Sequence, residues 1–63
     1  MPWNQEYYPT SMRHLSKVTR AKAIEIANAL LADGMEEGKA IRIAIAGAEA
    51  WARRRDLPVR DDE

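Results

Sequence analysis

The chain has 63 residues, of which 46% are hydrophobic and 32% are charged. A chain of this length forms one domain and buries only about 60% of the surface that its unfolded form exposes. Ten Lys and Arg residues balance ten Asp and Glu residues, so no net charge attracts nucleic acid or an anionic membrane. The absence of cysteine excludes disulfides and cysteine-based metal sites, and it fits a reducing compartment.

The first ten residues, MPWNQEYYPT, lack the basic region and the apolar core of a signal peptide. No apolar run approaches the roughly 18–20 residues that span a bilayer. We therefore expect a soluble, cytoplasmic protein with no membrane partner.

Residues 1–9 hold Trp3, Tyr7 and Tyr8, which are three of the four aromatic residues. Two prolines bracket this arm and argue against a continuous helix. A polar disordered tail rarely carries so much aromatic surface, so we expect the arm to fold back over the helices and cover the core. A ligand-binding aromatic cluster is the alternative, and the sequence does not decide between a lid and a binding surface.

A short helix is predicted over residues 10–15, where a Pro-Thr-Ser entry precedes Met12 and Leu15, both expected to face the core. His14 is the only histidine. Neither further metal ligands nor an orienting partner for a general base accompanies it. We expect His14 to lie at the surface or to be partly packed.

A longer helix is predicted over residues 16–33. Gly34 suits the left-handed position after this helix, and Met35 is placed for the hydrophobic contact just beyond it. The apolar side chains recur every three or four residues, which is the spacing of one buried helix face. They are Ala23, Ile24, Ile26, Ala27, Leu30 and Leu31.

The second long helix is predicted over residues 37–55, which contain the longest apolar run. The letters IRIAIA alternate like a strand, but the residues after them restore the helical spacing, and alanine favours a helix. Three arginines at the end complement the helix dipole, and Pro58 limits continuation. One arc of the helical wheel gathers the side chains expected to face the core: Ile41, Ala44, Ile45, Ala48, Trp51 and Ala52.

The prediction is therefore an all-α fold, in which helices over 16–33 and 37–55 form a hairpin. The short helix near residues 10–15 and the aromatic arm pack over that hairpin. Because the connection between the long helices is short, they must be antiparallel or angled. Residues 1–55 form a single domain, and residues 56–63 form a mobile C-terminal tail with little to bury.

A second apolar face lies on the other side of the last helix and consists of Ile43, Ala46, Gly47 and Ala50. A helix that is apolar nearly all round is usually buried on more than one side. Coverage by the aromatic arm is the favoured explanation. The alternative is a protein partner, either a second copy of the chain or another protein, because exposed apolar patches mark such sites.

The basic residues of the last helix are candidate phosphate contacts: Lys39, Arg42, Arg53, Arg54 and Arg55. They would suit a helix-turn-helix arrangement whose second helix presents arginines to nucleic acid. Zero net charge and the lack of a polar base-reading face oppose this. Complementation of the helix dipole and solubility explain the same charges.

No catalytic, metal-binding or cofactor-binding residues are expected. The carboxylates are not paired with a nucleophile or a ligand set; they are Asp33, Glu36, Glu37 and Glu49. Gly34 and Gly38 are not spaced as a phosphate loop. A domain this small has little volume for a pocket of even about 300 Å³. The sequence therefore implies neither an enzyme nor a small-molecule substrate.

Several stretches together form a pattern: MPW, then YP followed by Ser11 and Leu15, R-x-K-A-I-x-I-A-N-A-L-L over 20–31, G-x-x-E-G-x-A-I-x-I-A over 34–44, and AWA over 50–52. This pattern resembles a family of short, uncharacterised bacterial proteins and covers nearly the whole chain to about Arg54. A weaker likeness, in topology and a few apolar positions, is to the ChaB-like helical proteins named for cation-transport regulation. The resemblance implies a compact, mostly helical bacterial domain, and no function is carried over from it.

The function predicted from the sequence is a non-catalytic protein-interaction module that acts through a helix face. Weak nucleic-acid binding through the basic end of the last helix is the alternative. Binding that weakens steeply with salt would favour nucleic acid, and concentration-dependent size would favour self-association.

Overall fold

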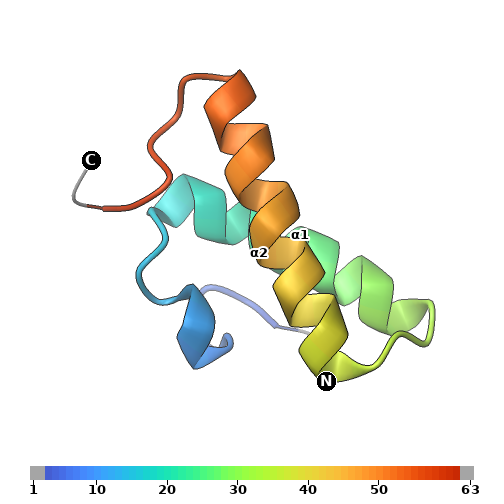
Figure 1. Ribbon diagram of the computed structural model, residues 1–63. Helices are drawn as coiled ribbons and strands as arrows, with labels where there is room; N and C mark the ends of the chain where they lie inside the picture. The colour runs from blue at the N-terminus through green and yellow to red at the C-terminus, as the bar shows by residue number, and fades with distance from the viewer. Residues whose placement is uncertain (1–2, 62–63) are drawn as a thin grey trace.

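The computed structural model describes residues 3–61, so the first two residues of the arm and the last two of the predicted tail lie outside the described residues. The elements are a 3-10 turn, η1 (Thr10–Met12), and two α-helices, α1 (Lys17–Ala32) and α2 (Glu37–Arg54). Figure 1 shows α2 crossing α1 at an angle. Within residues 3–61 there is no strand beyond two isolated bridges. The predicted all-α hairpin is confirmed, and the bounds of both long helices lie within one residue of those expected. The short helix predicted over residues 10–15 is instead a 3-10 turn that ends at Met12.

Local signals in the sequence set both ends of α1. The Ser16 hydroxyl accepts the backbone N–H of Thr19 and caps the first turn. At the other end Gly34 has a φ of +92°, which costs glycine little. The N–H groups of Gly34 and Met35 then donate to carbonyls of the last turn. The predicted helix stop at Gly34 is therefore confirmed.

The ends of α2 are set by acidic residues. The Glu36 carboxylate accepts the N–H groups of Gly38 at 2.8 Å and Lys39 at 3.0 Å, so it caps the helix. After the helix, Asp56 takes a left-handed φ of 55°, and the Leu57 N–H donates back to the last turn at 2.9 Å. This reverses the chain direction after α2.

The contact between the two helices is built from alanines. Small side chains at every fourth residue let two helix axes approach closely, and larger apolar side chains fill the edges. The fully buried alanines are Ala23 and Ala27 of α1 and Ala40, Ala44, Ala48 and Ala52 of α2, flanked by the partly buried Ile26, Ile41, Ile45 and Trp51. Met12 and Leu15, also fully buried, close one end of the core, as predicted.

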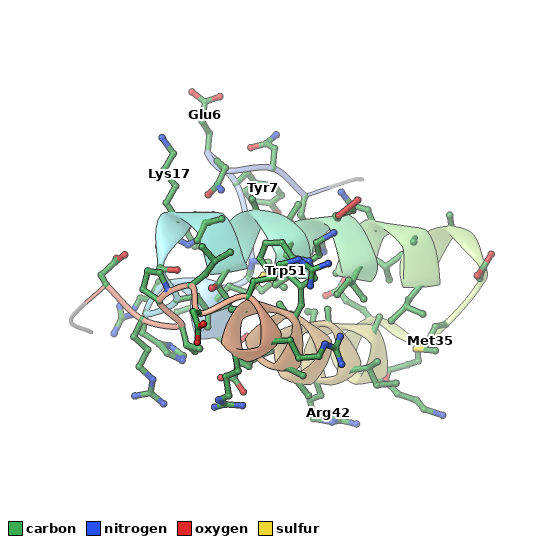
Figure 2. The ribbon with its side chains drawn as sticks, turned by 90° about the horizontal axis from the view of Figure 1, so that it is seen from above. Glu6, Tyr7, Lys17, Met35, Arg42 and Trp51 are labelled. Carbon is green, nitrogen blue, oxygen red and sulfur yellow. The ribbon has the colours of Figure 1, made fainter. Side chains whose placement is uncertain are left out.

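The aromatic arm lies along α1, on the side away from α2, as the position of Tyr7 in Figure 2 shows. The Asn28 amide holds it, accepting the Trp3 N–H at 2.8 Å and donating to the Trp3 carbonyl at 3.0 Å. Trp3 and Tyr8 pack against the core, whereas Tyr7 is 57% exposed and its ring lies 5.0 Å from that of Trp3. The arm therefore covers α1, whereas Ile43 and Ala46 on the far side of α2 stay exposed.

The segment after α2 packs on the start of α1, as Figure 1 shows for the red end of the chain. The Pro58 carbonyl accepts the hydroxyls of Ser16 and Thr19, the latter at 2.7 Å. The Val59 carbonyl accepts the Ser16 N–H at 2.9 Å, and Val59 is only 5% exposed. The prediction that residues 56–63 have little to bury is wrong for the described part, because the left-handed Asp56 turns the chain back onto α1.

Arg20 joins the three segments that meet at the start of α1. Its guanidinium donates to the Leu15 carbonyl at 2.8 Å and to two more carbonyls of the turn before α1. It lies 4.7 Å from the centre of the Tyr8 ring and 3.8 Å from an Asp61 oxygen. The Arg20 side chain is only 13% exposed. One side chain therefore links the arm, the turn and the C-terminal segment.

Candidate interaction surface

The predicted second apolar face is divided by the fold. A Cβ atom added to Gly47 would lie 3.4 Å from the Ile26 side chain, so Gly47 belongs to the contact between the helices. Ile43 is 41% exposed, Ala46 is exposed and Ala50 is partly exposed. The expectation that the aromatic arm covers this face is wrong, because Asn28 holds the arm on α1.

Side chains that point away from α1 share one side of α2, which we call the outer face. Successive residues of a helix step about 100° around its axis, so these side chains fall within an arc of about 140°. Figure 2 shows Arg42 on this side, pointing away from α1. The outer face consists of Lys39, Arg42, Ile43, Ala46, Glu49, Ala50, Arg53 and Arg54.

The outer face has an apolar centre and cationic ends. Its four cations face a single carboxylate, Glu49. The ion pairs of residues 3–61 are Arg20–Asp61 and Lys22–Glu25, and neither involves the outer face. The cations of this face therefore make no ion pair within the described residues, although Arg42 and Lys39 lie near enough to Glu36 to act on its charge.

At the N-terminal end of α2 the charges also act on Glu36. The N–H groups of Gly38 and Lys39 lower the pKa of the Glu36 carboxyl, and the charges of Arg42 and Lys39 lower it further. Glu36 is therefore ionised at neutral pH, and its role as the helix cap explains its lowered pKa.

The five predicted phosphate contacts do not form one cluster. Arg42 and Arg53 are eleven residues apart, which is about 17 Å along a helix. Arg55 does not belong with the other four cations, because its guanidinium lies 5.0 Å from the centre of the Trp51 ring and donates to the Trp51 carbonyl. The structure therefore places two cations at each end of the outer face and assigns Arg55 to packing.

Trp51 lies between the two helices, as Figure 2 shows. Lys22 approaches the same ring, with its Nζ atom 5.0 Å from the ring centre, and also pairs with Glu25 at 2.6 Å. Cations held over an indole ring stabilise by about 0.5–1 kcal/mol when exposed. Trp51 therefore joins α1 to the end of α2 and is a structural residue.

Within residues 3–61, no three His, Asp or Glu side chains gather where a metal could bind. A shallow, open depression is lined by Arg53, Asp56, Leu57, Pro58 and Val59. His14 is exposed. None of the helices in this part of the chain has the length and apolar character to cross a membrane.

The chain is similar to the uncharacterised protein YdaT of Bacillus subtilis (strain 168), with 47% identity over 62 residues. The alignment covers 98% of this chain but 41% of YdaT, so the chain spans about two-fifths of the length of the curated relative that it matches. No protein-family model matches the chain, and no solved structure matches it. The relative agrees with the likeness to uncharacterised bacterial proteins. The likeness to ChaB-like proteins still depends on topology and a few apolar positions.

Proposed function

We propose that the chain is a non-catalytic, cytoplasmic protein-interaction module that binds a protein partner through the outer face of α2. The observation that carries the proposal is the apolar line of Ile43, Ala46 and Ala50, of which Ile43 is 41% exposed. The cations of the same helix face make no ion pair within residues 3–61. An exposed apolar centre with a polar rim is the usual anatomy of a protein interface. The cysteine-free sequence supports a reducing compartment.

The other exposed apolar side chains fit a partner surface less well. Tyr7 stacks on Trp3 within the arm, so part of its ring already has a contact. Val18, which is 39% exposed, stands in the first turn of α1 beside the exposed Lys17. Ile43 instead continues along its helix into Ala46 and Ala50, which gives a partner helix a continuous line of approach.

Photo-crosslinking tests this proposal. A photo-reactive phenylalanine replaces Ala46 on the outer face, and the matched control carries it in place of Ala29, which is exposed on α1. In a bacterial extract we expect crosslinked products from position 46. Excess wild-type chain should suppress these products, and the Ile43→Glu variant should suppress them about tenfold less well. Identical products from both positions, or equal suppression by both competitors, would contradict the proposal.

Nucleic-acid binding is the alternative function, and the four cations of the outer face favour it. The separation of those cations and the carboxylate of Glu49 between them count against it, because a phosphate backbone is repelled by a carboxylate. An amide NMR titration with a mixed-sequence DNA duplex at low salt separates the two functions. Shifts at Lys39, Arg42, Arg53 and Arg54 that fade as salt rises would replace the protein partner by nucleic acid.

A further inference from the structure

Arg42 and Arg53, one from each end of the outer face, lie in one line. They are eleven residues apart, which is just over three whole turns, so they project within about 20° of each other. Lys39 and Arg54 flank them on the side of Ile43. A partner that meets the apolar centre therefore also meets positive charge about 17 Å apart at both ends.

A second copy of the chain does not complement this surface. In a two-fold dimer each outer face would pack on the same outer face of its partner. An antiparallel pairing would place Lys39 and Arg42 of one copy near Arg53 and Arg54 of the other. Each outer face carries four cations and one carboxylate, Glu49, so the pair brings eight cations and two carboxylates together. The excess of like charge at such an interface costs affinity.

A nucleic acid complements it only in part. Its phosphates could meet the terminal cations, but Ile43 and Ala46 would contribute little and Glu49 would repel the strand. A protein helix with an apolar stripe between carboxylates complements both parts of the outer face, because its carboxylates can pair with the terminal cations and its apolar stripe can pack on the apolar centre. Ala46 and Ala50 are small, so such a helix could approach to an axis distance of about 8–10 Å.

We infer that the partner of the outer face is an acidic amphipathic helix of another protein, with carboxylates about eleven residues apart on either side of an apolar stripe. This inference rests on the proposed function and names the partner's chemistry. The carboxylates pair with Arg42 and Lys39 at one end and with Arg53 and Arg54 at the other. Apolar side chains at helical spacing pack over Ile43, Ala46 and Ala50.

Two synthetic helical peptides of the same length and apolar positions test the inference on the full 63-residue chain. The acidic peptide has glutamates at the flanking positions, and its control has glutamines. We expect the acidic peptide to shift the amides of Ile43, Ala46 and Ala50, and to bind about tenfold more tightly than the control at low salt. Salt should reduce that difference.

A charge-exchange variant provides the second arm. The double variant Arg42→Glu, Arg53→Glu should fold, because both side chains are exposed and lie outside the core. It should lose its preference for the acidic peptide and gain one for a peptide with lysines at the flanking positions. Melting curves of the variant and the parent check that the fold is kept.

The outcomes separate the two proposals. Equal binding of the acidic and glutamine peptides at the outer face would overturn the acidic partner and leave the interaction module standing. Failure of the acidic peptide to bind, or shifts confined to α1, would also overturn the acidic partner. Equal suppression in the crosslinking experiment would overturn the module itself. Tighter binding of a DNA duplex at Arg42 and Arg53 would replace the acidic helix by nucleic acid.

Discussion

The start of α1 and the outer face of α2 use arginine in opposite ways. At the start of α1, Arg20 is largely buried and donates to three backbone carbonyls. On the outer face, Arg42 and Arg53 are exposed, and neither takes part in an ion pair of the described chain. Arginine therefore holds the fold together at the start of α1 and makes no ion pair within the described residues on the outer face.

The largest effect on stability is expected from Arg20. In Arg20→Met, the carbonyls of the turn before α1 lose a charged donor, and the arm and the C-terminal segment lose their common contact. We expect a loss of about 2–4 kcal/mol in the free energy of unfolding, measured by urea denaturation. Arg42→Met is the matched control and should change stability by less than about 0.5 kcal/mol. Equal losses in the two variants would remove the distinction between the two regions.

Gly47 tests where the contact between the helices ends and the outer face begins. Gly47→Leu drives a side chain into Ile26 and should cost about 1–3 kcal/mol by overpacking. Ala46→Leu places the same side chain one residue earlier, on the outer face, and should leave thermal stability almost unchanged. If Ala46→Leu were as destabilising as Gly47→Leu, the outer face would be covered.

Asp56 tests the turn that returns the chain to α1. Its φ of 55° is strained for a residue with a side chain, so Asp56→Gly should relieve about 1–2 kcal/mol of strain. The greater freedom of the unfolded chain offsets about 0.4–1 kcal/mol of this, which leaves a small net gain in stability. Asp56→Ala should destabilise it, because alanine enters the left-handed region less readily than aspartate does. Both changes are measured by chemical denaturation, and a loss of stability in Asp56→Gly would contradict the turn.

Glu36 provides the smallest effect, and it depends on pH. Its pKa is lower in the folded state than in the unfolded state, so the cap stabilises above the unfolded pKa of about 4.3 and this contribution is lost as pH falls through the folded pKa. Glu36→Gln should therefore lower the melting temperature at pH 7 and change it less at pH 3. Glu37→Gln is the control, since the Glu37 side chain does not cap α2. Equal effects of Glu36→Gln at both pH values would contradict a charged cap.

Much of the fold follows from short-range pattern. The caps at Ser16 and Gly34 and the apolar spacing of both helices are local properties, so the sequence predicts the helix bounds to within one residue. The position of the C-terminal segment is not local. Its hydrogen bonds join Pro58 to Thr19, 39 residues away, and Val59 gives little apolar signal alone.

Two features of the structure, one at the start of α1 and one on the outer face, have a signal in the sequence. A cation in the first turn of a helix opposes the helix dipole, so Arg20 at the start of α1 indicated a partner outside its own helix. The spacing of Arg42, Ala46 and Arg53 places cations and apolar residues on one face, yet they were interpreted as two separate features. The location of the arm on α1 depends on the Asn28 amide, which no pattern indicates.

The most direct test of the account is whether this chain leaves the outer face of α2 uncovered. Nuclear Overhauser contacts between the Ile43 methyl protons and the aromatic protons of Trp3, Tyr7 and Tyr8 measure this at the residue concerned. We expect contacts from the Trp3 ring to α1 near Asn28 and none to Ile43. Strong contacts between Ile43 and the aromatic rings would mean that the arm covers the outer face, and no partner would then be needed there.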